Sequence, residues 1–188
     1  LLVGAPSNTD AVPIPGQAHV FEQVGGVWTE TLSLSPSISS ASDRFGYGVD
    51  ASPNRLVVGG PRSDANGLTN GGAVFIHDRE SNGSWGAEEL LVPGDLTDWD
   101  RFGQSVSLDG DRLLVGAPSG ANDFGDDTGV AYLFNKVGEQ WVQETKFSPW
   151  DSNQTENSFG ESVKLEGDLA YIGACLQDRG ADSQVGAV

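Results

Sequence analysis

The stretch DRLLVGAP, at residues 111–118, joins a short apolar run to a Gly-Ala-Pro ending, and related stretches recur along the chain. The other copies are LLVGAP at 1–6, LVVGGP at 56–61 and the divergent AYIGAC at 170–175. The glycines shared by the four copies are separated by 55, 57 and 57 residues: Gly4, Gly59, Gly116 and Gly173. A regular period of this kind indicates that one structural unit is built several times, and this decides the fold.

Two further markers recur with the same period. Phe-Gly pairs follow one another at intervals of 57 residues: Phe45-Gly46, Phe102-Gly103 and Phe159-Gly160. Tryptophans follow at intervals of 57 and 56 residues: Trp28, Trp85 and Trp141. Because three independent markers share one period, internal repeats organise nearly the whole chain.

Each repeat has the pattern of four short strands. In the middle repeat these segments are either continuously apolar or alternate apolar with polar residues: 102–108, 112–117, 129–134 and 140–147. Turns rich in Gly and Asp separate them, and no segment has helical periodicity. A four-stranded antiparallel sheet has two faces to bury, so neighbouring repeats must stack face to face. The sequence therefore predicts an all-β fold of four-stranded β-propeller blades without a long helix.

The order of the markers also predicts the blades. We expect the innermost strands to include 102–108 and 159–165, followed outward by 112–117 and 170–174. The chain then divides into a partial blade, two blades and a second partial blade: 1–44, 45–101, 102–158 and 159–188. About three and a half blades would be present, and we expect further blades of the same chain to complete a larger propeller.

The Phe-Gly pair followed by LLVGAP resembles the FG-GAP repeat, which is known from integrin α-subunits and from bacterial and algal surface proteins. The strands that begin at the repeated tryptophans are more similar to the microbial form. The resemblance implies a β-propeller, usually of seven blades, that is extracellular and binds other molecules. Such a module would serve cell adhesion or surface assembly.

Many repeats of this family carry a calcium-binding loop between the FG strand and the GAP strand. The corresponding segments here are short turns: 49–56, 107–113 and 164–170. Their few turn residues cannot supply the roughly six to eight oxygen ligands that calcium prefers. We therefore expect no calcium at these turns.

Charge and composition exclude several kinds of partner. The 188 residues include 27 Asp and Glu against 10 Lys and Arg, a formal net charge of −17. A chain this acidic repels phosphate backbones, so we expect no nucleic acid partner. No apolar run reaches the roughly 18 residues of a membrane-spanning helix, so we expect no membrane insertion. The only cysteine, Cys175, excludes an internal disulfide, and we expect its thiol to be buried and unreactive.

Strand alternation sorts the loops onto two faces. The connections between second and third strands and the links between blades share one face, here called the long-loop face: 6–15, 35–44, 61–71, 93–101, 118–128 and 148–158. The opposite face has only tight turns and is called the short-hairpin face. Function concentrates in long loops on a rigid scaffold, so we expect the ligand, a protein or a glycan, on the long-loop face. That face is also acidic.

Two tryptophans stand outside the repeated position, in links between blades. Trp99 and Trp150 are candidates for stacking on a sugar or anchoring a protein, together with Asp95 and Asp98 nearby. The alternative, which we favour, is that both indoles pack down as plugs between blades.

Three carboxylates in the segment NDFGDDTG are candidates for calcium binding: Asp123, Asp126 and Asp127. The liganding pattern is loose, and a solvated acidic turn accounts for the same residues. Calcium is therefore a possible cofactor at this loop, and no other cofactor is indicated.

Few residues favour catalysis. His19 falls in a third strand and His77 just beyond one, and neither adjoins a nucleophile or a metal-ligand pattern. We therefore expect no enzymatic site. Asn82 and Asn153 begin Asn-x-Ser/Thr sequons, which would carry glycans in a secreted eukaryotic protein or else arise by chance.

Three functions fit these observations. The first is a non-enzymatic extracellular module for adhesion or surface assembly. The second is a carbohydrate-binding module of a larger secreted enzyme or surface protein, and the third is a purely structural part of a surface filament. Sugar binding that depends on Trp99 or Trp150 would separate the second from the others.

Overall fold

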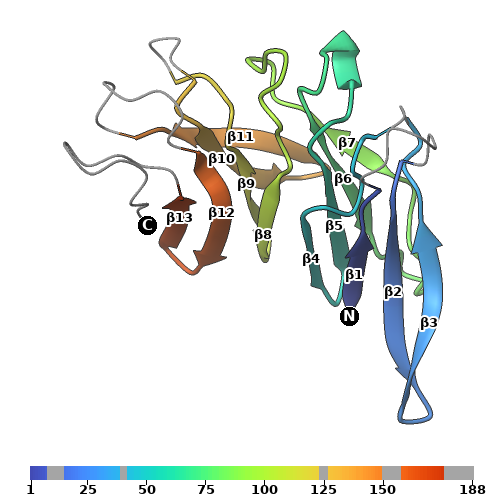
Figure 1. Ribbon diagram of the computed structural model, residues 1–188. Helices are drawn as coiled ribbons and strands as arrows, with labels where there is room; N and C mark the ends of the chain where they lie inside the picture. The colour runs from blue at the N-terminus through green and yellow to red at the C-terminus, as the bar shows by residue number, and fades with distance from the viewer. Residues whose placement is uncertain (8–14, 39–41, 123–126, 150–157, 176–188) are drawn as a thin grey trace.

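The computed structural model describes residues 1–7, 15–38, 42–122, 127–149 and 158–175, and its regular structure is almost entirely β (Figure 1). Within these ranges no α-helix occurs, and the single helical element is a short 3-10 turn. The described residues include no helix long and apolar enough to cross a membrane. The predicted all-β fold is confirmed.

The strands form four antiparallel sheets, numbered in chain order. The first sheet has the order β1–β2–β3: Leu2–Ala5, Gln17–Val24 and Val27–Leu34. The second has the order β4–β5–β6–β7: Val49–Ser52, Arg55–Gly60, Ala73–Asp78 and Glu89–Leu91. The third has the order β8–β9–β10–β11: Ser105–Asp109, Arg112–Ala117, Val130–Val137 and Gln140–Phe147. The fourth pairs β12 with β13: Phe159–Glu166 and Leu169–Ala174.

Sequential strands are neighbours in every sheet, as they are in propeller blades. The predicted strand at 112–117 matches β9, and the predicted strand at 140–147 matches β11. The predicted strand at 102–108 is partly wrong, because β8 begins only at Ser105. Gly103 has φ +90°, which interrupts the extended backbone, and Phe102 instead forms an isolated bridge to Gly72 of the preceding blade.

In the second and third sheets, the second strand is buried on both faces. Successive residues of β9 point into different cores: Leu113 and Val115 pack against the second sheet, and Leu114 packs against the fourth. In β5, Val57 belongs to the core shared with the third sheet, whereas Val58 belongs to the core shared with the first. This explains why these strands are continuously apolar rather than alternating.

The phenylalanines of the three Phe-Gly pairs pack between sheets. Phe102 is fully buried and contacts the rings of Tyr132 and Phe134 edge-on, with centroids 5.5 and 6.0 Å away. Phe45 is also fully buried and meets Phe75 edge-on at 5.1 Å. Aromatic rings in this geometry fill the space between blades and add to the energy of burial.

The glycine of the Gly-Ala-Pro ending allows two blades to approach. A Cβ atom built on Gly59 would lie 1.9 Å from the carbonyl oxygen of Gly103 in the next blade, and one on Gly116 would lie 1.9 Å from that of Gly160. Gly4 stands in the same relation to Gly46. Only glycine fits at these positions, so the repeated motif is a requirement of blade stacking.

On the short-hairpin face, polar side chains join consecutive blades. Asp50 accepts a hydrogen bond from the backbone N–H of Leu108 at 2.8 Å, and Ser107, one period later, accepts one from Leu165 at 3.0 Å. Arg55 donates to the carbonyl oxygen of Gly110 at 3.1 Å, so the first tight turn of one blade is tied to that of the next. Asp50 therefore has a structural partner at a turn where we expect no calcium.

Charged pairs join the outer strands of neighbouring blades. The Lys136 ammonium, 7% exposed, lies 2.7 Å from Asp78 and 3.2 Å from Glu89 of the preceding blade. Burial opposes ionisation of Asp78, but hydrogen bonds and charges from Arg55 and Lys136 outweigh it and hold the pKa of this carboxyl below its ordinary 3.8. Burial likewise opposes protonation of Lys136, and the two carboxylates outweigh it and raise its pKa.

Replacing Lys136 with methionine should therefore destabilise the protein in a pH-dependent way. Because Asp78 is partly exposed, solvent screens the attraction, and we expect a loss of about 1 to 2 kcal/mol at pH 7. A lowered carboxyl pKa stabilises the folded state above the unfolded pKa, and this contribution disappears as pH falls through the folded pKa. Unfolding free energies from urea titrations should therefore converge with those of the wild type as the pH falls through the lowered pKa of Asp78. Lys164→Met, at an exposed position, is the control.

Candidate functional site

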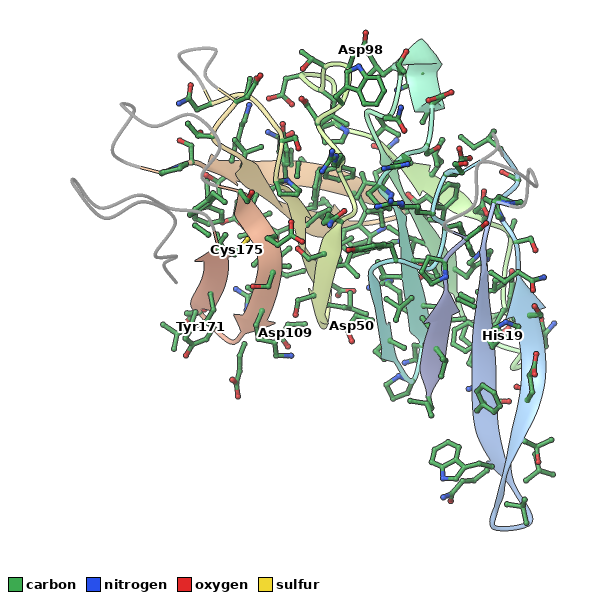
Figure 2. The ribbon with its side chains drawn as sticks, viewed as in Figure 1. His19, Asp50, Asp98, Asp109, Tyr171 and Cys175 are labelled. Carbon is green, nitrogen blue, oxygen red and sulfur yellow. The ribbon has the colours of Figure 1, made fainter. Side chains whose placement is uncertain are left out.

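The described parts of the long loops lie at one end of the sheets and the tight turns lie at the other (Figure 1). Figure 2 shows Asp98 at the long-loop end, whereas Asp50 and Asp109 lie at the turns of the opposite end. The two faces predicted from strand alternation are therefore present.

The long-loop face contains a hollow, here called the Trp99 hollow, with a volume of about 410 Å³. Its walls come from the link before the third sheet, the loop after β9 and the residue before β12: Asp98, Trp99, Arg101, Pro118, Ser119, Asp127 and Ser158. The Trp99 indole is 56% exposed, so the expectation that it packs down as a plug is wrong.

Backbone contacts hold Trp99 in place. Its N–H donates to the carbonyl oxygen of Thr69 at 2.8 Å, and the N–H of Thr69 donates to the Asp98 carboxylate at 2.8 Å. Thr69 follows the 3-10 turn η1, Ala65–Gly67, in the long loop of the second blade. The indole is thus presented by two loops that are hydrogen-bonded to each other.

The backbone at Trp99 is in the left-handed region, with φ +73°. Ser42, 57 residues earlier, has φ +75°, and Arg44 and Arg101 share values of +56° and +61°. Non-glycine residues seldom adopt this conformation, which costs about 1 to 2 kcal/mol. The repeat architecture therefore imposes the turn, and its shape turns the large side chain at position 99 toward solvent.

The buried carboxylate of Asp100 stabilises the same turn through hydrogen bonds. Its carboxylate is 3% exposed and accepts hydrogen bonds from the N–H and the hydroxyl of Thr97, both at 2.8 Å. Burial raises the pKa of the Asp100 carboxyl, and the bonds from Thr97 oppose this only in part. The charge of Asp127 also raises it, which places Asp127 within electrostatic reach of this turn.

The other predicted ligand-binding residues are distributed differently. Asp98 and Asp127 line the hollow with Trp99, but Asp95 does not, because its carboxylate is paired with Lys146 at 3.0 Å. Trp150 lies outside the described residues. The predictions for it remain untested.

The calcium prediction is also untested. Of its three carboxylates, only Asp127 is described, and it is exposed; Asp123 and Asp126 fall in the undescribed part of the loop. Among the residues that the structure does describe, no group of three acidic, histidine or cysteine side chains is close enough to hold a metal ion.

Neither histidine lies in the Trp99 hollow. His19 is in β2 and pairs with Glu30 at 2.8 Å. His77 lies within β6 rather than just beyond it, so that prediction is wrong; it is 7% exposed and its Nδ1 is 3.2 Å from the carbonyl oxygen of Gly86. The strand continues through His77 because it pairs with the buried Leu56 of β5.

Two further predictions concern surface chemistry. Cys175 is exposed, so the prediction of a buried thiol is wrong. The residue lies just after β13, which ends at Ala174, and is therefore outside the strand. Asn82 lies exposed in the turn after β6, where its side-chain oxygen accepts hydrogen bonds from the N–H and hydroxyl of Ser84. Asn153 lies outside the described residues.

Arg101 is a member of the hollow that sequence reasoning missed. The sequence does contain a signal for Arg101. The motif DRFG occurs at both 43–46 and 100–103, so the arginine has a repeated position two residues after Trp99. Ser119 and Ser158 were also missed, and nothing in their local sequence marks them.

Comparison with known families agrees with this architecture. The sequence model of the family described as FG-GAP repeat matches three consecutive segments, 28–77, 85–134 and 141–188. Each match begins at one of the repeated tryptophans and runs through a link between blades into the next sheet. A search of curated proteins found no match. Because the three segments cover more than half of the chain, this β-propeller protein belongs to the FG-GAP repeat family.

Proposed function

We propose that this chain is a non-enzymatic recognition module of the extracellular space or cell surface, which takes part in adhesion or surface assembly. Its partner binds the long-loop face, and the Trp99 hollow is the centre of the contact. Family membership and the formal net charge of −17 support a binding role that does not involve nucleic acid. Neither described histidine reaches the hollow, which supports a role without catalysis.

The exposed indole of Trp99 carries the proposal. Tryptophan, tyrosine and arginine side chains carry much of the binding energy of many protein interfaces. Trp99 is held by hydrogen bonds between two loops, and Arg101 lines the same hollow. A rigid anchor loses little conformational entropy on binding.

Trp99→Ala should reduce adhesion without reducing stability. Beads coated with the chain would be placed under flow on the surface of the cells that produce it, with soluble chain as competitor. Loss of a central anchor weakens binding by about 2 kcal/mol or more, or roughly thirtyfold. The thermal transition should change little, because the side chain is 56% exposed and the hydrogen bond that holds the loop comes from the backbone N–H of residue 99.

Trp28→Ala is the matched control. Trp28 is also 56% exposed, but it lies in the β2–β3 hairpin on the short-hairpin face. Its replacement should leave bead retention unchanged. Equal losses for the two variants, or no loss for Trp99→Ala, would contradict the proposed function.

Sugar recognition is the second candidate function, as a carbohydrate-binding module of a larger secreted enzyme or surface protein. The specific observation in its favour is the shape of the site, a hollow of about 410 Å³ beside an exposed indole rather than a flat surface. Hollows of this size are suited to small ligands.

A further inference from the structure

We propose that the Trp99 hollow binds an uncharged sugar unit whose flat face stacks on the indole, so that the adhesion proposed above is adhesion to a neutral glycan. This inference rests on the proposed function and adds the chemistry of the ligand. Three features carry it: the size of the hollow, its mixed charge and the rigidity of its aromatic wall.

Size favours a small ligand. The volume of about 410 Å³ falls within the range of roughly 300 to 1,000 Å³ that is typical of ligand pockets. The hollow is open on the long-loop face, where an attached chain of further units could extend outward. A protein partner would more often meet a broad surface of about 800 Å² on each side.

The charges of the hollow favour a neutral ligand that both donates and accepts hydrogen bonds. Asp98 and Asp127 bring carboxylates to its wall, and Arg101 brings an exposed guanidinium for which the described residues provide no ion pair. An anionic ligand would meet the two carboxylates, and a cationic ligand would meet the guanidinium. A sugar carries neighbouring hydroxyl groups that can donate to the carboxylates and accept from Arg101 at once.

Hydroxyl groups of the protein add to this match. Ser119, after β9, and Ser158, before β12, also line the hollow. Serine hydroxyls both donate and accept, as sugar hydroxyls do. The polar wall therefore suits a ligand rich in hydroxyls, while the indole suits its apolar C–H face.

The aromatic wall formed by Trp99 is preorganised for binding. Asp98 and Thr69 fix the two loops to each other, and buried Asp100 fixes the turn through two bonds to Thr97. The left-handed backbone at Trp99 belongs to a turn that recurs at Ser42, so the repeat fixes the backbone that carries the indole. Binding to a preformed site loses less conformational entropy, because its loops are already ordered.

The test is a binding screen with the whole chain and three classes of probe: neutral oligosaccharides of glucose, galactose and mannose, oligosaccharides of uronic acids, and a lysine-rich peptide. Hits would be measured by calorimetry for the wild type, Trp99→Ala, Asp98→Asn and Trp28→Ala. We expect a neutral oligosaccharide to bind, with a loss of at least about tenfold for Trp99→Ala and a smaller loss for Asp98→Asn. Trp28→Ala should bind like the wild type.

The outcomes separate the two proposals. If only the uronic acid or the lysine-rich probe binds in a Trp99-dependent way, the neutral-sugar inference is overturned while the recognition face stands. If no probe binds but bead adhesion still requires Trp99, the inference fails and the proposed function survives. If neutral sugars bind equally well to Trp99→Ala, the sugar site lies elsewhere and the inference is wrong. If no probe binds the wild type, and if Trp99→Ala leaves bead adhesion unchanged, both proposals are overturned.

Discussion

Gly59→Ala should cost more than about 3 kcal/mol of unfolding free energy, although it adds a single methyl group. The new Cβ would lie 1.9 Å from the carbonyl oxygen of Gly103 and 2.9 Å from its carbonyl carbon. Both atoms belong to the backbone of the next blade, which carries its own hydrogen bond from Gly103 N–H to Gly116 at 3.1 Å. No side chain can rotate away to make room, so the second and third blades must separate.

Urea unfolding monitored by tryptophan fluorescence would measure this loss. Gly94→Ala is the control, because a Cβ at Gly94 meets no atom within 4 Å and its backbone lies outside the left-handed region. That variant should stay within about 0.5 kcal/mol of the wild type. A Gly59→Ala protein as stable as the control would show that the blades can move apart freely, and would refute the stacking role of the motif.

Phe102→Ala should cost about 3 to 5 kcal/mol, the range expected when a buried aromatic ring is truncated. The ring is fully buried and meets Tyr132 and Phe134 edge-on, so its removal leaves a cavity in the core between the second and third sheets. The backbone there cannot close the cavity easily, because the neighbouring Gly103 is fixed against Gly59.

The same urea titration would measure the Phe102→Ala loss, with Tyr171→Ala as control. Tyr171 is 46% exposed on β13 (Figure 2), so its truncation should have a small effect. A Phe102→Leu variant should recover part of the stability, because leucine refills part of the cavity. Equal stability of Phe102→Ala and Tyr171→Ala would contradict the assignment of Phe102 to the core.

The strands were largely predictable because their pattern is local. A continuously apolar run between turn residues defined β9 to the residue, and the alternating run beginning at Gln140 defined β11. The start of β8 was not predictable from apolar pattern, because it depends on the left-handed backbone of Gly103. His77 was misplaced for a related reason, since its pairing with Leu56 extends β6 beyond the apolar run.

The site was only partly predictable. Sequence reasoning named Asp98, Trp99 and Asp127, and the structure brings these three residues to one hollow. It expected the indole to be buried, and it also named Asp95, which the structure pairs with Lys146 instead. The pairing of an acid with a lysine 51 residues away leaves no mark in the sequence near either residue.

By itself, the sequence determined the period and the blade-like all-β fold, because each repeat carries the same local pattern of strands, turns and small residues. Only the tertiary structure decided that Trp99 is exposed and that Arg101 lines the same hollow. These depend on contacts between loops distant in the sequence, such as the hydrogen bond from Thr69 to Asp98. A repeat fixes what its copies share, whereas a binding site arises where one copy differs and several loops converge.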